Sequence, residues 1–349
     1  FEFGEGSMKK IALAIIGVLL WCVSGDAQTP YYQGKSMTIV VGTVAGDIYD
    51  LYARAIALHM GKYLPGNPNI IVQNMPGAGH MIAANYLYGV AKPDGLTIAG
   101  ILPTLYFEQL TGRAEVKFDW IKFNWIGNAT KSPQVLYMRA DAPYKTIEDV
   151  RNAKEPPKCG TTGTSNMGYF VPKLLDETIG AKFNVIAGYQ GGSEVDLAVE
   201  KGEIQCRSLS AEAFFSREPF HTWRKKGFVR VLAYGGKSRD EKLPDAPTVY
   251  ELLEKYKTPE LGRRLATALL AAGEFHRPYI GPPNLRPEHV KMLREAFGKT
   301  MKDPGFLAEA AKKKLDIDPT SGAEVEALVK EVMSQPKDVI ERLKVLMGQ

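Results

Sequence analysis

The sequence reads SMTIVVG at residues 36–42, NIIVQ at 69–73 and LTIAGIL at 96–102, and these three short apolar runs decide the fold class. Each run is rich in β-branched residues and is bounded by turn residues, which is typical of a buried strand. Between the runs, residues 50–63 and 81–91 carry apolar side chains near helical spacing. Strands that alternate with helices in this way predict an α/β fold with a largely parallel sheet.

The alternation continues in the second third of the chain and then gives way to helices. Further strands are expected at 134–139, 158–161, 184–187, 203–209 and 229–234. Two α/β units, with a return of the chain to the first, suit a length of 349 residues. We therefore expect one lobe at 31–130 and 236–349 and a second lobe at 131–235. A ligand would bind in the cleft between the lobes, at loops that follow the strands.

The first residues have the pattern of an export signal. Met8 is followed by two lysines, an apolar run over 11–23 and small residues at Gly25 and Ala27. As a helix the apolar run is about 20 Å long, too short for ~30 Å of hydrocarbon. We expect residues 1–27 to be upstream residues and a signal peptide cleaved near Ala27, with the mature chain in the periplasm; a buried helix or a membrane anchor is the alternative.

Composition excludes several classes of protein. Hydrophobic residues make up 45% and charged residues 24% of the chain, which is ordinary for a globular protein and unlike a collagen, a disordered tail or a multi-span membrane protein. The formal net charge of +5 is too small to indicate a nucleic-acid-binding surface. The five histidines lack the spacing of a zinc site, so no metal and no cofactor are expected.

Two cysteines remain after the leader, Cys159 and Cys206. In an oxidising compartment they could form a disulfide. They could equally be two buried small apolar residues, as free cysteines often are. The sequence leaves both interpretations open.

Three polar turns lie between an expected strand and an expected helix. They read TVAGDIYD at 43–50, GTTGTSN at 160–166 and YQGGS at 189–193. The first N–H groups of a helix have no partner within the helix and carry partial positive charge. Small residues and hydroxyl groups at such a position can hold an anion without any arginine or lysine. Three such turns in one exported chain predict an anion-binding cleft.

The same turns allow two other interpretations. Asp50, Ser165 and Ser193 are residue types that commonly cap a helix, so the turns could be ordinary helix starts. Ser165 also lies between Gly163 and Met167, a pattern that lacks the last glycine of a G-x-S-x-G nucleophile elbow. A secreted hydrolase or transferase built on Ser165 is the enzyme alternative, and it would need a general base beside that hydroxyl.

Six short segments then carry a family resemblance. In chain order they are KSMTIVV at 35–41 with AGDIYD at 45–50, NMPGAG at 74–79, AKPDG at 91–95, GTTGTSNMG at 160–168, YQGG at 189–192 and LPDAPTV at 243–249. Together they resemble the substrate-binding proteins of tripartite tricarboxylate transporters, the Bug family of periplasmic receptors. The resemblance runs from about residue 34 to the end of the chain. It implies an α/β, two-lobed periplasmic binding protein fold with a central cleft between two mostly parallel sheets.

The resemblance also implies a function. The protein would be a receptor without enzymatic activity that captures a small carboxylate, aliphatic or aromatic, and delivers it to membrane transporter subunits. It would act as a monomer and bind no nucleic acid; a sensor that reports to a signalling protein is an alternative. Backbone amides, hydroxyl groups and water would hold the ligand. The residues expected at the ligand are Thr43, Val44, Ala45, Gly46, Asp47, Tyr49, Thr104, Thr162, Thr164, Ser165, Asn166, Tyr189, Ser208 and Ser210.

Several of these positions depart from the family pattern. Asp47 stands where the family usually has a glycine, and its carboxylate would repel a carboxylate ligand or pair with a ligand ammonium group. Tyr49, Tyr106 and Tyr169 would either stack on a ligand ring or simply line the surface between the lobes. The departures leave the identity of the carboxylate open.

Overall fold

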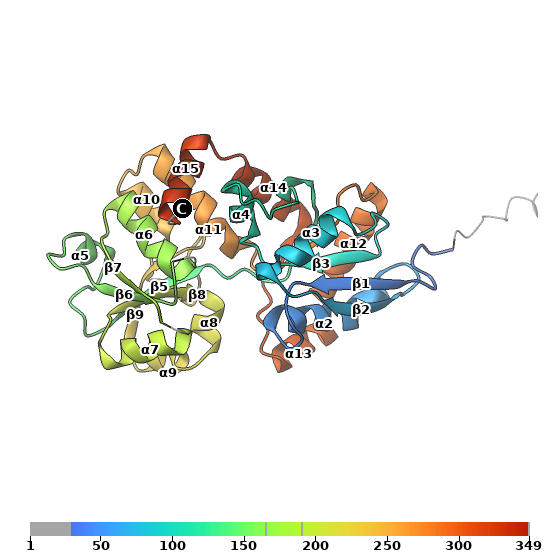
Figure 1. Ribbon diagram of the computed structural model, residues 1–349. Helices are drawn as coiled ribbons and strands as arrows, with labels where there is room; N and C mark the ends of the chain where they lie inside the picture. Colours follow the sequence, from blue (N-terminus) through green and yellow to red (C-terminus); the bar gives the residue numbers. More distant parts are fainter. Residues whose placement is uncertain (1–28, 165, 190, 348–349) are drawn as a thin grey trace, which may run out of the picture.

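The computed structural model describes residues 29–164, 166–189 and 191–347, and this part of the chain forms two lobes, each built on one sheet (Figure 1). The first sheet has the strand order β11-β4-β10-β3-β1-β2. Its strands are β1 (Ser36–Val41), β2 (Asn69–Asn74), β3 (Thr97–Gly100), β4 (Asn124–Asn128), β10 (Pro278–Gly281) and β11 (Thr320–Ser321). The expected export signal at 1–27 and Ser165 lie outside the described residues.

The second sheet has the strand order β7-β6-β8-β5-β9. Its strands are β5 (Gln134–Arg139), β6 (Lys158–Thr161), β7 (Asn184–Ala187), β8 (Cys206–Ser210) and β9 (Val229–Tyr234). The helices of the described residues are α2 (Ile48–Met60), α3 (Met81–Gly89), α4 (Leu105–Leu110), α5 (Ile147–Arg151), α6 (Met167–Ile179), α7 (Gly192–Lys201), α8 (Ala211–Ser216), α9 (Phe220–Lys225), α10 (Val249–Lys255), α11 (Glu260–Glu274), α12 (Pro287–Thr300), α13 (Pro304–Lys312), α14 (Gly322–Met333) and α15 (Lys337–Leu346). Short 3-10 turns follow at Gly61–Tyr63, Ala78–His80 and Trp120–Lys122.

Both sheets are mixed, which corrects the expectation of two mostly parallel sheets. Strand β1 pairs in parallel with β2 and β3, but β10 runs antiparallel to both of its neighbours. In the second sheet β6, β7 and β8 are parallel, and β5 runs antiparallel to β8 and β9. The two-residue β11 is also antiparallel to its neighbour β4. The reversed strands β5 and β10 are each the first that the chain forms after it crosses from the other lobe. Each therefore starts at the side that faces that lobe and must run away from it.

The last third of the chain is divided between the lobes. Helices α12, α13 and α14 pack on the first sheet or on its helix α2, whereas α10, α11 and α15 contact α6 of the second lobe (Figure 1). The lobe boundaries at 31–130, 131–235 and 236–349 stay a prediction. The contacts of α10, α11 and α15 differ from it, because these helices pack on the second lobe and not on the first. The amphipathic pattern of α11 predicts that one face is buried, but not which lobe buries it. Among the described residues, no helix combines the length and apolar character needed to cross a membrane.

The apolar core continues from one lobe into the other. One buried cluster includes Leu105 and Trp125 of the first lobe together with Leu136 and Leu174 of the second. The lobes therefore share packing on the side where α4 meets α6 and α11.

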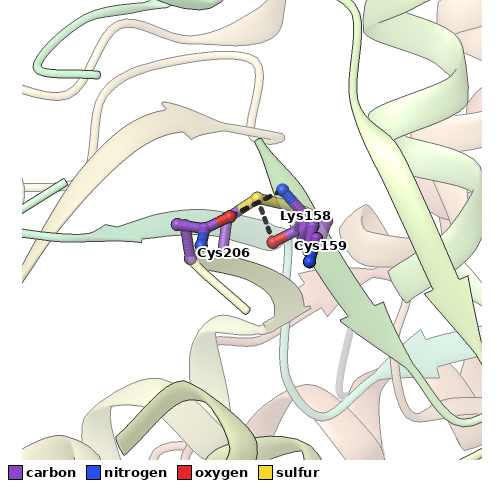
Figure 2. The surroundings of a disulfide bond; sticks show 4 residues. Lys158, Cys159 and Cys206 are labelled. Carbon is purple, nitrogen blue, oxygen red and sulfur yellow. Dashed lines mark hydrogen bonds between the residues drawn. A yellow bond between two sulfur atoms is a disulfide. The ribbon is translucent and has the colours of Figure 1, made fainter. Parts of the chain in front are cut away.

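Cys159 and Cys206 form a disulfide, so the alternative of two free cysteines is excluded in this structure. Figure 2 shows the pair on neighbouring strands, with a bond between the sulfur atoms. The two residues are register partners of the parallel strands β6 and β8, and both are fully buried. Their Cα atoms are 4.4 Å apart, within the range that a disulfide spans. The bond ties together the two strands that lead to the loop at 161–166 and to Ser208.

Candidate functional site

The N-terminus of α2 is occupied by two carboxylates of the protein itself. Asp47 is the capping residue, and its Oδ1 accepts a hydrogen bond from the backbone N–H of Tyr49 at 3.0 Å. Asp50, which the sequence suggested as the cap, is instead buried in the first turn. Its Oδ2 accepts hydrogen bonds from the N–H of Gly46 at 2.9 Å and from Nε of Arg54 at 2.8 Å. Part of the negative charge of Asp47 is therefore compensated by the helix.

Asn74, at the end of β2, holds the first loop in place. Its Nδ2 donates to the carbonyl oxygen of Thr43 at 3.0 Å and to Oδ1 of Asp50 at 2.9 Å. Val44, Ala45 and Gly46 form the exposed tip of this loop. Sequence reasoning did not assign Asn74 to the site; its place at the start of the segment NMPGAG was the available signal.

Tyr49 is buried beneath this loop, with only 7% of its surface exposed. The ring of His80 meets its ring edge-on at a centroid distance of 4.5 Å, and the guanidinium of Arg277 lies 4.5 Å over its face. Its hydroxyl donates to the carbonyl oxygen of His276 at 3.4 Å. Burial raises the pKa of Tyr49 to about 12, so the hydroxyl stays protonated. In this conformation Tyr49 offers little surface for stacking on a ligand.

A buried ion pair joins the two lobes next to Tyr49. Nη2 of Arg277 lies 3.1 Å from Oε2 of Glu212, and Nε2 of His276 lies 3.5 Å from the same oxygen. Burial alone would raise the pKa of Glu212, but the hydrogen bond from His276 and the charge of Arg277 outweigh it and lower the pKa. Glu212 belongs to α8, two residues after Ser210. Sequence reasoning missed both members of the pair because nothing local links residues so far apart in the chain.

The loop after β6 is organised by Asn166, which caps α6 in place of the suggested Ser165. Oδ1 of Asn166 accepts hydrogen bonds from the N–H of Gly168 and from the hydroxyl of Thr161, both at 2.9 Å. Nδ2 of Asn166 donates to the hydroxyl oxygen of Thr162 at 3.1 Å. Thr162 is therefore held within the loop.

The remaining predicted residues of the second lobe lie at the same end of the sheet. Thr164 is exposed and Tyr189 is half-buried. The hydroxyl of Ser210 caps α8 by accepting a hydrogen bond from the N–H of Ala213 at 3.4 Å. A Cβ at Gly168 would meet the carbonyl oxygen of Ser208 at 3.2 Å, so the glycine permits the close approach of α6 to β8.

Two predicted hydroxyl groups have no hydrogen-bond partner within the described part of the chain. They are Oγ1 of Thr43 in the first lobe and Oγ of Ser208 in the second, and both atoms are buried. Buried polar atoms without a partner are uncommon because they have lost their bonds to water. These hydroxyls are suited to accept a further partner when the surroundings rearrange.

A cavity of about 460 Å³ brings together predicted residues of opposite lobes. Thr104, at the start of α4, lines it from the first lobe and Asn166 lines it from the second. Arg113 lies in the same cavity, but it is paired with Glu108 at 3.0 Å and with Glu115. The volume falls within the range usual for small-molecule sites. The other predicted residues do not line this cavity.

The two other tyrosines named from the sequence differ in their surroundings. Tyr106 is fully buried, and its hydroxyl donates to the carbonyl oxygen of Ala268 in α11 at 2.5 Å. It therefore lines the contact between the lobes, which was one of the two interpretations. Tyr169 is half-buried, with its ring 5.8 Å from Nζ of Lys173.

Known proteins resemble this chain at the level of sequence family and fold. The sequence matches the model of the tripartite tricarboxylate transporter family receptors over residues 52–345. Among curated proteins none matches it. A solved TctC solute-binding protein from Polaromonas, without ligand, has a TM-score of 0.71 and 22% identity, and covers 89% of this chain and 100% of its own.

Two further solved structures share the fold. The periplasmic binding protein BugD has a TM-score of 0.55 and 19% identity, and covers 90% of this chain and 98% of its own. An R. palustris protein solved with adipate has a TM-score of 0.56 and 17% identity, and covers 90% and 97%. These likenesses confirm the two-lobed periplasmic binding protein fold that the sequence predicted.

Proposed function

Because the chain belongs to the tripartite tricarboxylate transporter receptor family, we propose that it captures a small carboxylate between its two lobes. The observation that carries the proposal is the cavity of about 460 Å³ in which Thr104 of one lobe and Asn166 of the other line the same space. A related protein of this fold was solved with adipate, a dicarboxylate. A ligand in this cavity would contact residues of both lobes at once and could therefore hold the lobes together.

The two charged residues that line the cavity, Arg113 and Glu108, form an ion pair with each other, so neutral groups are left to hold a carboxylate. The N-terminus of α6, a helix of 13 residues, directs partial positive charge toward the cavity. The hydroxyl of Thr104 in the cavity, and that of Thr162 in the loop that Asn166 holds, can donate hydrogen bonds to carboxylate oxygens. The full set of predicted ligand residues, from Thr43 to Ser210, remains part of this proposal.

Capture depends on a hinge between the lobes. The two crossing segments, 129–133 and 275–277, run side by side: the N–H of Ala129 donates to the carbonyl oxygen of Arg277 at 3.0 Å, and the N–H of His276 donates to that of Thr130 at 3.2 Å. Such short paired segments can bend while the lobes stay rigid. A ligand drives closure only through contacts that the open form lacks, and the unpartnered hydroxyls of Thr43 and Ser208 would supply them.

The proposal includes the setting of the protein. The export signal expected at 1–27 would direct the chain to the periplasm, where the closed monomer would deliver its ligand to membrane transporter subunits. It would bind and release the carboxylate without changing it. A sensor protein in place of the transporter is the alternative partner.

A thermal-unfolding screen of mono-, di- and tricarboxylates tests the proposal, with sugars and cations as controls. At a hundredfold excess over Kd the ligand should stabilise the protein by about 2.7 kcal/mol, which raises the melting temperature. NMR spectra of the ligand should stay unchanged after prolonged incubation. Stabilisation by sugars or cations alone, or the appearance of a product that depends on Ser165, would contradict the proposal.

A further inference from the structure

A second cavity, of about 440 Å³, lies at the outer edge of the second sheet. Its walls come from α8, α9, the edge strand β9 and the loop at 242–246. None of the residues predicted to bind the carboxylate lines it. The cavity is therefore separate from the site between the lobes.

Three cationic side chains line this cavity: Arg224, Arg230 and Lys242. Within the described ranges, none of them has a carboxylate oxygen within 4 Å. Asp245 also lines the cavity, but it is exposed and forms no such pair. By contrast, Arg207 and Arg139 of this lobe are paired, with Asp196 and Asp141. The charge of Lys242 acts on the carboxyl of Asp316 and Asp245 lines the cavity, so the positive charge is only partly compensated, and least at the two arginines.

Aromatic rings and backbone carbonyls hold the cations in place. The guanidinium of Arg224 lies 4.9 Å over the ring of Phe215, and Nζ of Lys242 lies 4.9 Å over the same ring. Arg224 also donates to the carbonyl oxygen of Phe215 at 3.1 Å, and Arg230 donates to that of Ala140.

The two guanidinium groups are only partly satisfied. Nε of Arg224 and Nε of Arg230 are buried and have no hydrogen-bond partner in the described part of the chain. Burial lowers the pKa of Arg224, and no neighbouring carboxylate opposes the shift. A site that keeps cations in fixed positions without their counter-charges has the electrostatic character of an anion site.

We propose that this cavity is a second anion-binding site, which takes a carboxylate or phosphate group through Arg224, Arg230 and Lys242. The group can come from a dissolved anion or from an acidic side chain of a protein that docks on this edge of the lobe. Arginine and lysine together supply charged donors, unlike the neutral groups proposed for the site between the lobes. The proposal does not depend on which carboxylate the protein captures.

Isothermal titration of the full mature chain tests the site with two probes, inorganic phosphate and a short glutamate peptide. Lys242→Gln removes one charged donor from an exposed position. It should weaken the binding of whichever probe binds the wild type by about tenfold. Lys226→Gln is the matched control, because it removes the same charge from an exposed position near the end of α9 that does not line the cavity. The control should change the affinity by less than about twofold, as expected for an exposed, screened charge that does not line the cavity.

The outcomes separate the two sources from each other and from the site between the lobes. Phosphate binding that Lys242→Gln weakens supports a dissolved anion, and binding of the peptide alone supports a protein partner. The proposal fails if neither probe binds, or if Lys242→Gln and Lys226→Gln have equal effects. It also fails if Asn166→Ala abolishes binding while Lys242→Gln does not weaken it, because the anion would then occupy the site between the lobes.

Discussion

The carboxylate of Glu212 lies 3.1 Å from the guanidinium of Arg277, and this ion pair joins the second lobe to the segment by which the chain returns to the first. Only 7% of the Arg277 side chain and 11% of the Glu212 side chain are exposed. Arg277 also covers the ring of Tyr49, at the base of the first loop. The pair therefore connects the first loop, the hinge and α8.

Removal of one partner of this pair should strongly destabilise the protein. Arg277→Gln leaves the buried carboxylate of Glu212 without its cation, which typically costs about 3–5 kcal/mol. Urea-induced unfolding followed by circular dichroism would measure the change. Arg264→Gln breaks an exposed pair with Glu260 and should cost less than about 1 kcal/mol. Equal losses in the two variants would show that the buried pair has no special role.

His80 should make the stability depend on pH. Burial lowers the pKa of His80 to about 4, whereas in the unfolded chain it is about 6.5. As the pH falls from 6.5 toward 4, the imidazole of His80 binds a proton in the unfolded state but stays neutral in the folded state. The free energy of unfolding therefore decreases by up to about 3 kcal/mol. Unfolding at several pH values would show this slope in the wild type.

The matched variants for this prediction are His80→Asn and His221→Asn. His80 has a positive φ of 71°, a conformation that asparagine tolerates better than most residues. The first variant should flatten the slope between pH 6.5 and 4. The second changes an exposed histidine and should leave the slope as it is. A slope that His80→Asn does not alter would assign the pH dependence to other groups.

Asn74 should matter for the first loop more than for the fold. Asn74→Ala removes the hydrogen bonds to Thr43 and Asp50 and the one that Oδ1 accepts from Arg54, and should lower the stability by about 1–3 kcal/mol. Because the loop is then less well held, carboxylate affinity measured by titration should fall as well. Asn85→Ala is the control, since it too removes side-chain hydrogen bonds, with Glu115 and Lys117, but away from the site. Loss of affinity in both variants would refute a specific role of Asn74.

The disulfide should contribute to stability by limiting the unfolded chain. The double variant Cys159→Ala/Cys206→Ala should unfold about 2–4 kcal/mol more easily than the oxidised protein. A reductant should shift the urea midpoint of the wild type toward that of the variant and leave the variant unchanged. An unchanged midpoint in the double variant would mean that packing alone holds β6 to β8.

Strands β1, β2 and β3 of the first lobe could be predicted because their signal is local. The runs at 36–42, 69–73 and 96–102 became β1, β2 and β3 with shifts of one or two residues at their ends. Strands β4, β10 and β11 were missed. The sequence of β10, PYIG, is short, contains proline and glycine, and lies in a stretch that favours helices. It is a strand because β3 and β4 pair with it on both sides. Only the tertiary structure supplies that information.

In the candidate site, too, local features could be predicted from the sequence and long-range contacts could not. The helix starts at 43–50 and 160–166 have turn chemistry that can be read from neighbouring residues, so their position after strands was predictable. Which residue caps each helix was not: Asp47 and Asn166 do so instead of Asp50 and Ser165. The ion pair of Glu212 and Arg277 joins residues 65 apart in the chain, and no periodic pattern reports such a contact.

The return of the chain from α14 to α15 has a mechanical consequence. This segment is a third covalent connection between the lobes, in addition to the two crossing segments at residues 129–133 and 275–277. Helix α4 also packs against α6 and α11. Because of this packing and the third connection, the lobes have little freedom to twist about the line that joins their centres. We therefore expect the lobes to open and close by rotation about one fixed edge, so that every ligand enters from the same side.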